Sequence, residues 1–135
     1  NWSINAMHIK TPTQQTQIRS LSGGNQQKVI FGRWMLTEPE IFLLDEPTRG
    51  IDVGATEFIR KKLVELSRAG AAVLLVSADL NEVMELSDSL IVMNGGHIAA
   101  YFEDTSALTD EEMGEYMLGL KRQSDEEIGK VLYAK

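Results

Sequence analysis

The chain has 135 residues, of which 43% are hydrophobic and 24% are charged, and its 13 basic and 20 acidic side chains give a net charge of −7. This hydrophobic content, with only 3 prolines and 11 glycines, supports the packed core of one modest domain or part of one, and excludes a disordered or fibrous chain. The absence of cysteine excludes disulfide scaffolds, thiolate zinc sites and cysteine nucleophiles, and the acidic balance disfavours general nucleic-acid binding, which needs a basic face.

The N-terminal stretch from residue 1 to residue 19 is polar and aperiodic, so we expect a lead-in segment there. Within it, residues 1–6 precede Met7 and have a patternless composition, which would suit a vector remnant. No apolar run approaches the roughly 18 residues that cross a bilayer, and the N-terminus lacks the pattern of a secretory signal. The sequence therefore predicts a soluble chain.

Helical and strand patterns alternate after the lead-in segment. Ser22 is expected to cap a helix that ends before Pro39. The wholly apolar run Ile41–Leu44 then stops abruptly at acidic residues, as a strand buried on both faces does. Asp52 is expected to cap a long helix, and residues 72–76 are interpreted as a second buried strand.

The remaining sequence predicts a hairpin and three further helices. Residues 90–93 and 97–102 are interpreted as two strands joined by a glycine-containing turn. Residue pairs typical of capping boxes begin the helices: Asp79 with Glu82, Thr109 with Glu112, and Ser124 with Glu127. The alternation of strands and helices predicts an α/β fold with a mainly parallel sheet and flanking helices.

A serine and two glycines open the first long helix. Ser22, Gly23 and Gly24 leave backbone N–H groups unpaired, allow another chain to approach closely, and present the positive end of the helix dipole. This arrangement would suit an anion. In isolation, however, such a tripeptide is more typical of a simple cap and turn.

Two adjacent acids follow the first strand. Asp45 and Glu46 are expected at the carboxyl end of a parallel strand, where open α/β sheets bind ligands. Asp45 could hold Mg²⁺ directly or through water, and Glu46 could orient or deprotonate a water for attack on a phosphoryl group. The alternative is that both are solvated residues at a strand end.

Three segments in this order resemble the signature motif, the Walker B strand and the D-loop of ABC-transporter ATPases: Leu21–Lys28 (LSGGNQQK), Ile41–Pro47 (IFLLDEP) and Thr48–Asp52 (TRGID). More narrowly, they are similar to the second ATPase domain of the fused double ATPases of bacterial importers for simple sugars and nucleosides. The similarity is strong from about residue 19 to residue 93, and looser to about residue 120. It implies a partial P-loop NTPase fold of the ABC ATPase type.

The resemblance also implies roles for individual residues. Ser22, Gly23, Gly24 and Asn25 would contact the γ-phosphate of ATP held by a partner ATPase domain. Asn25 stands where many relatives have glutamine, which is typical of the sugar-importer branch. ATP and Mg²⁺ are the implied cofactors of the whole protein.

Three acids and one alanine complete the implied site. Asp45 matches the Walker B aspartate that helps to hold Mg²⁺, Glu46 matches the hydrolytic base, and Asp52 matches the D-loop aspartate. Ala78 occupies the switch position, which is usually histidine, and alanine has no side-chain hydrogen bond for a γ-phosphate. The composite site built on this domain's own Walker B is therefore expected to hydrolyse ATP poorly, whereas the site that Ser22 serves would be competent.

No segment matches G-x-x-x-x-G-K-S/T, the loop that cradles phosphates, and no adenine-stacking region precedes the signature motif. The resemblance therefore implies the C-terminal part of an ATPase domain over residues 20–104, followed by acidic C-terminal helices over residues 105–135. Alone, this chain is expected neither to bind ATP tightly nor to hydrolyse it. The implied partners are a second ATPase domain and the transporter's membrane subunits, at the inner face of a bacterial cell membrane, and no nucleic acid.

In this family's sheet, the strand that feeds the phosphate loop lies between the strands interpreted here as 72–76 and 90–93. Its absence would leave these strands about 9–10 Å apart, with unpaired backbone groups on both. We expect either that the two strands pair directly or that an element is exchanged with a second copy, which would give a homo-oligomer.

Two other functions remain open at this point. The first is an ABC-type ATPase lobe of a DNA-repair or chromosome-maintenance protein, against which the net charge of −7 and the lack of coiled-coil heptads weigh. The second is a non-catalytic module whose acidic C-terminal helices bind a partner protein.

Overall fold

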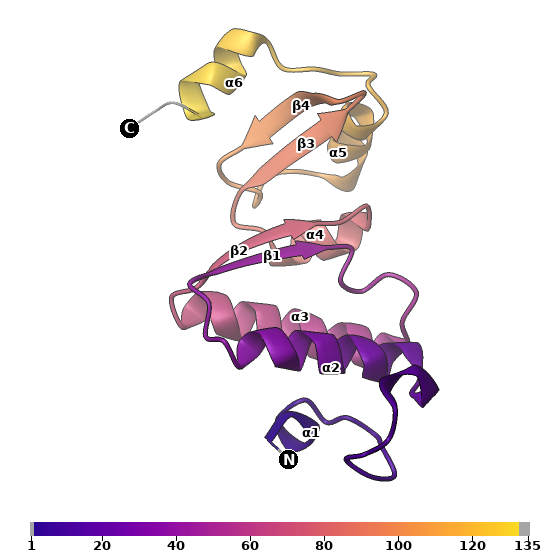
Figure 1. Ribbon diagram of the computed structural model, residues 1–135. Coiled ribbons are helices and arrows are strands. Elements are labelled where there is room, and N and C mark those ends of the chain that lie inside the picture. The colour runs from indigo at the N-terminus through magenta and orange to yellow at the C-terminus, as the bar shows by residue number, and fades with distance from the viewer. Residues whose placement is uncertain (1, 133–135) are drawn as a thin grey trace. The chain divides into compact units, whose positions relative to one another are not determined.

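A computed structural model describes residues 2–132 of the chain. The chain divides into two compact units, the first of which ends at Ser77 and the second of which begins at Ala78 (Figure 1). Each unit combines a two-stranded sheet with helices. None of the helices between residues 2 and 132 has the length and hydropathy needed to cross a bilayer.

The first unit contains the sequence from the N-terminal segment to the second strand. Its elements are α1 (Trp2–Ala6), a 3-10 helix (Ile18–Ser20), α2 (Gly23–Met35), β1 (Ile41–Asp45), α3 (Val53–Arg68) and β2 (Ala72–Val76). The predicted helix, strand, helix and strand are all confirmed. The helical pieces before Ser22 were not predicted, because Met7 and Ile9 are the only buried residues among those described there, and two positions establish no period.

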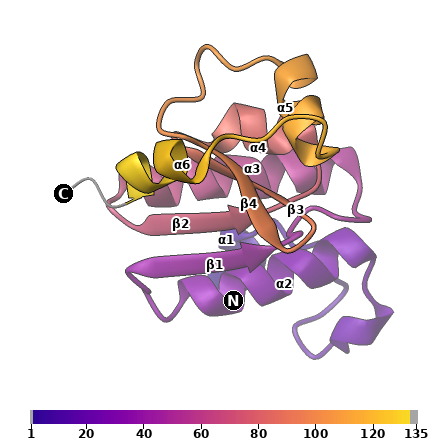
Figure 2. The ribbon, with the colours of Figure 1, turned by 90° about the horizontal axis from the view of Figure 1, so that it is seen from above.

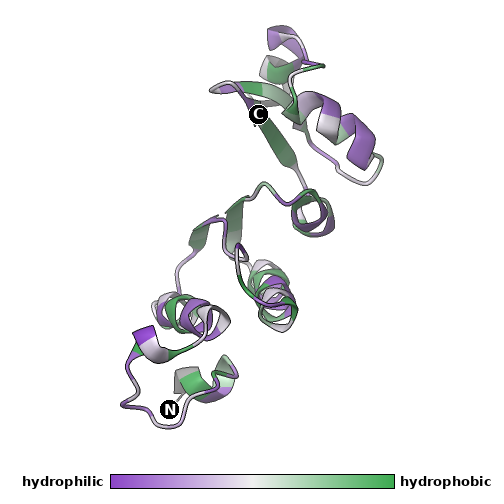
Figure 3. Cartoon of the chain, turned by 90° about the vertical axis from the view of Figure 1, so that its right-hand side faces the viewer, coloured by the Kyte–Doolittle hydropathy of each residue, from purple (hydrophilic) through white to green (hydrophobic). Residues whose placement is uncertain are grey.

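The two strands of the first unit are parallel and in register from Ile41 opposite Ala72 to Asp45 opposite Val76 (Figure 2). Both long helices, α2 and α3, lie on the same face of this sheet (Figures 1 and 3). On that face the Phe42 ring lies 6.3 Å from the ring of Phe31 of α2, and Phe42 is only 6% exposed. This packing fixes the carboxyl ends of β1 and β2 relative to the helix that follows Ser22.

The prediction that both strands are buried on two faces is wrong. Leu43 is 71% exposed, and apolar residues at alternate positions of the two strands share its exposure. The other exposed large residues of this kind are Ile41, Leu74 and Val76. The reason is that α2 and α3 cover one face of the sheet, so side chains that alternate across the strands are buried only on that face.

The second unit is built around a hairpin. Its elements are α4 (Leu80–Leu86), β3 (Leu90–Asn94), β4 (His97–Phe102), α5 (Asp110–Met117) and α6 (Asp125–Leu132). The strands are antiparallel, and the turn between them places Gly95 at φ +57° and Gly96 at φ +80°. Both residues of this turn need the left-handed region, which explains the glycine pair.

The second unit has its own core between the hairpin and the helices. Its buried residues are Val83, Val92, Ala99, Ala100, Met113 and Tyr116. The rings of Tyr116 and Phe102 meet edge to face at 5.4 Å, a favourable geometry for aromatic pairs. The predicted caps of α5 and α6 are confirmed, because the hydroxyls of Thr109 and Ser124 each accept a hydrogen bond at 3.2 Å from the N–H three residues later.

Direct pairing between residues 72–76 and 90–93 does not occur. Within the described part of the chain, β2 pairs with β1 alone and β3 pairs with β4 alone. The hairpin supplies β3 with an antiparallel partner, so local pairing satisfies the backbone groups along one edge of this strand. The exchange of an element with a second copy stays a prediction.

Candidate functional site

Ser22 caps α2 as predicted. Its Oγ accepts hydrogen bonds from the backbone N–H of Asn25 at 3.4 Å and from Nδ2 of the same residue at 2.9 Å. Ser22 and Gly23 are exposed, whereas Gly24 is buried. The positive end of the helix is therefore accessible beside a hydroxyl, an arrangement that suits an anion.

Asn25 makes contacts within the chain that the sequence did not reveal. Its Nδ2 donates to Ser22, and its Oδ1 accepts a hydrogen bond from the backbone N–H of Lys10 at 2.8 Å. Both ends of the amide therefore hold the N-terminal segment against the start of α2. The contact with Lys10 could not be predicted from the sequence, because Lys10 lies 15 residues earlier in an aperiodic segment.

The start of α2 packs against the start of α3. A Cβ placed on Gly24 would lie 2.7 Å from Oδ2 of Asp52 and 2.8 Å from Cβ of Ala55, distances that real Cβ atoms do not adopt. Asp52 also caps α3 as predicted, because its Oδ1 accepts a hydrogen bond from the N–H of Ala55 at 2.9 Å. Glycine at position 24 thus lets two of the predicted site segments come into contact.

Asp45 and Glu46 stand where β1 ends. Asp45 is exposed, and the N–H of Glu46 donates to the carbonyl of Val76 at 2.8 Å, which extends the strand pairing by one residue. Glu46 then adopts φ +48°, in the left-handed region that residues other than glycine rarely occupy. Its carbonyl accepts a hydrogen bond from the N–H of Arg49 at 3.2 Å. The chain therefore turns sharply at the carboxyl edge of the sheet, with both acids at that edge.

The residues present fit a metal site in which the protein supplies one carboxylate and the substrate supplies further ligands. Within residues 2–132, no three His, Asp or Glu side chains converge as metal ligands. Mg²⁺ is commonly bound through one or two carboxylates together with substrate phosphates. Asp45, an exposed carboxylate at the end of β1, suits this mode of binding.

Gln27 links α2 to the turn that follows β1, and this role was not predicted from the sequence. Its Nε2 donates a hydrogen bond to the carbonyl of Pro47, 20 residues later, at 3.1 Å. The available signal was its position on the helix, because Gln27 shares a face with the buried residues Gly24 and Phe31. A half-buried amide on such a face needs a partner.

Ala78 opens the second unit, whereas the acidic pair lies in the first. It is exposed and precedes Asp79, whose Oδ1 accepts a hydrogen bond from the N–H of Glu82 at 3.2 Å and so caps α4. The predicted capping box is confirmed in this respect. At the switch position itself, the side chain is a methyl group with no hydrogen-bonding capacity.

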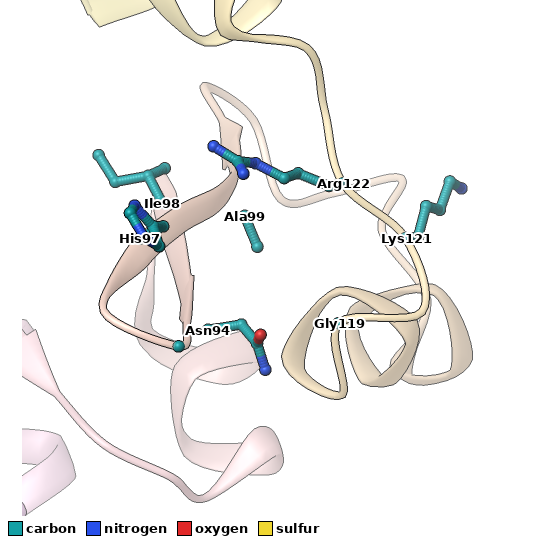
Figure 4. Close-up of a pocket in the computed structure, with 8 residues that line it drawn as sticks. Asn94, His97, Ile98, Ala99, Gly119, Lys121 and Arg122 are labelled. Carbon is teal, nitrogen blue, oxygen red and sulfur yellow. The ribbon is translucent and has the colours of Figure 1, made fainter.

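A cavity of about 170 Å³ lies in the second unit and contains none of the predicted site residues (Figure 4). Lys121 and Arg122 at its rim pair with carboxylates, Lys121 with Glu112 at 3.1 Å and Arg122 with Asp125 at 3.2 Å. The hydrogen bond that the Lys121 ammonium donates to the Glu112 carboxylate raises the pKa of Lys121 above its usual value. Because these cations already have acidic partners, the cavity has no evident preference for an anion.

Comparisons with known proteins agree with the resemblance to ABC-transporter ATPases. A family model described as "ABC transporter" matches residues 3–49. The galactose/methyl galactoside import ATP-binding protein MglA of Escherichia coli K12 is 48% identical over 112 residues, and its counterpart in Salmonella typhimurium is equally similar. These alignments cover 83% of this chain and 22% of each relative, so the chain spans about a fifth of the length of these proteins.

Solved structures show the same fold. An ABC transporter of metal-chelate type in an inward-facing conformation superposes with a TM-score of 0.73 and 22% identity, covering 93% of this chain and 52% of that one. A dimeric ATP-binding cassette bound to ADP and phosphate gives a TM-score of 0.67 at 23% identity, with 78% and 45% covered. The chain therefore has the fold of an ABC ATPase cassette.

Proposed function

We propose that this chain belongs to the ATPase domains of ABC transporters and acts within the ATP-binding subunit of a bacterial importer for simple sugars or nucleosides. The observation that carries the proposal is the packing of Gly24 against Asp52, because it joins the segment of Ser22 to the loop that follows the acidic pair. The 48% identity to a galactose and methyl galactoside import protein favours a sugar as the transported solute.

The site residues have separate roles in this proposal. Ser22, Gly23, Gly24 and Asn25 present the start of α2 to the γ-phosphate of ATP bound by another ATPase domain. The exposed hydroxyl of Ser22 and the buried, closely packed Gly24 support this assignment. A phosphate at this position would be stabilised by backbone N–H groups and by the helix dipole.

The acidic pair serves the other composite site. Asp45 would hold Mg²⁺ together with the phosphates of ATP, and the ion would supply charge neutralisation for phosphoryl transfer. Glu46 orients or deprotonates the attacking water, as its place at the carboxyl edge of the sheet allows. Ala78 offers no hydrogen bond to the γ-phosphate, so turnover at this site is slow.

We assign residues 20–104 to the C-terminal part of the second ATPase domain of such a subunit. Its partners are the other ATPase domain and the membrane subunits of the importer, at the inner face of the cell membrane. Since the sequence of this chain contains no phosphate-binding loop, ATP is bound mainly by groups outside this sequence.

A chimera tests the proposal. The 112 aligned residues of the Escherichia coli relative are replaced by the corresponding residues of this chain, and ATP turnover and methyl galactoside uptake are measured in cells that lack the original protein. We expect both activities to be retained at a substantial fraction of the unmodified level, because the site residues come from this chain and the phosphate loop from the host. The host protein with the segment deleted is the matched negative control.

The two readouts separate the parts of the proposal. Turnover without uptake would uphold the ATPase assignment and reject the match to sugar-importer membrane subunits. A chimera that folds and assembles, yet neither turns over ATP nor supports uptake, would overturn the proposed function.

A further inference from the structure

Gln27 lies two residues after Asn25, the last of the residues that would contact a nucleotide. Its side chain is half-buried, and its Nε2 lies 3.1 Å from the carbonyl oxygen of Pro47, which is itself a buried residue. The hydrogen bond therefore crosses from α2 to the turn between β1 and α3. Hydrogen bonds made by half-buried groups are costly to break, because the freed carbonyl has reduced access to water.

The turn that receives this bond is under conformational constraint. Glu46 has a positive φ, and Pro47 contributes no N–H of its own. Two hydrogen bonds hold the backbone around it, from Arg49 N–H to the Glu46 carbonyl at 3.2 Å and from Ile51 N–H to the Thr48 carbonyl at 3.5 Å. Pro47 lies in the sequence between the two acceptor residues, Glu46 and Thr48. Its own carbonyl accepts the hydrogen bond from Gln27.

We propose that Gln27 is a positioning residue that keeps the start of α2 in register with the turn at Glu46 and Pro47. This inference rests on the proposed function, because the start of α2 and the turn would serve two different nucleotides. A shift of the turn when nucleotide binds at Asp45 is passed through the Gln27 amide to α2 and hence to Ser22. Gln27 itself contacts neither nucleotide.

Hydrogen exchange of the 135-residue chain tests the structural part. Gln27→Met keeps the volume of the side chain and removes the donor, so the amides of Arg49 and Ile51 should exchange about 3- to 10-fold faster. Gln27→Lys keeps a donor on a flexible stem and should restore most of the protection. Gln26→Met is the matched control, because the Gln26 amide bonds the nearby Leu21 carbonyl at 2.8 Å rather than the turn.

Steady-state turnover of the chimera tests the functional part. Gln27→Met should lower kcat about 3- to 10-fold with an unchanged KM for ATP, and Gln27→Lys should recover kcat. A merely structural role would lower the amount of folded protein without this split between kcat and KM.

Each outcome decides the inference. Unchanged exchange in Gln27→Met would overturn it, and so would faster exchange with unaltered kcat, because the bond would then not position the site. If the unsubstituted chimera itself lacks turnover, the proposed function fails. The exchange data then still decide whether Gln27 holds the turn.

Discussion

Ser22→Arg in the chimera is expected to lower ATP turnover by about 100-fold or more, whereas Glu46→Gln should lower it by less than about 2-fold. In the proposed function, Ser22 serves the composite site on the other ATPase domain, and an arginine there would remove the hydroxyl and fill the space at the exposed start of α2. In the proposed function, Glu46 serves the composite site that is expected to hydrolyse ATP poorly. Total ATP hydrolysis of the purified chimera measures both effects.

A matched control separates catalysis from helix capping. Ser124 caps α6 with the same hydroxyl chemistry, since its Oγ accepts from Glu127 N–H at 3.2 Å. Ser124→Arg should therefore remove a similar cap and lower the free energy of unfolding by about 1 kcal/mol, while ATP turnover is retained. Equal losses in Glu46→Gln and Ser22→Arg would contradict the asymmetry between the two sites. Equal losses in the two serine variants would contradict a nucleotide role for Ser22.

Gly24→Ala is expected to destabilise the first unit by about 1–3 kcal/mol, because the added methyl group collides with Asp52 and Ala55 and the helices must move apart. Gly23→Ala is the matched control. Its Cβ would have the Gly50 carbonyl at 3.9 Å as its nearest neighbour, so the substitution meets no obstacle. It should leave stability unchanged or raise it by up to about 1 kcal/mol, as alanine is the better helix former.

Urea unfolding followed by tryptophan fluorescence measures this contrast. Both tryptophans, at positions 2 and 34, belong to the first unit, so the signal reports its unfolding. The midpoint should fall in Gly24→Ala with an unchanged slope. Equal midpoints for the two alanine variants would show that α2 and α3 do not pack as closely as the Gly24 contact requires.

Local patterns predicted most of the secondary structure. The caps at Ser22, Asp52 and Thr109 follow from side chains that can satisfy the first N–H groups of a helix, and these are properties of a few adjacent residues. The turn after Asn94 was equally predictable, because consecutive glycines suit the positive φ of a tight hairpin. Signals of this kind depend little on the rest of the chain.

Burial was predicted less well than secondary structure. An apolar run such as Ile41–Leu44 indicates a strand, yet which of its faces is covered depends on where helices far along the chain pack. Phe42 faces the helices and is buried, whereas its neighbour Leu43 is exposed. Sequence alone carries no signal that distinguishes these two positions.

The candidate site shows the same division. The motif residues were predicted from their order and types, and the structure brings Gly24 and Asp52 into contact. The contacts that orient the motif, from Asn25 to Lys10 and from Gln27 to Pro47, join residues 15 and 20 positions apart. Such pairs have no spacing rule, because they depend on tertiary packing rather than on the period of a helix or strand.

Calorimetric titration of the purified 135-residue chain with Mg-ATP tests the central claim most directly. In the proposed function, the chain presents the start of α2 and an acidic strand end to nucleotides that are bound mainly by groups outside it, so we expect no saturable heat of binding. A one-to-one binding isotherm for Mg-ATP with this chain alone would contradict the account.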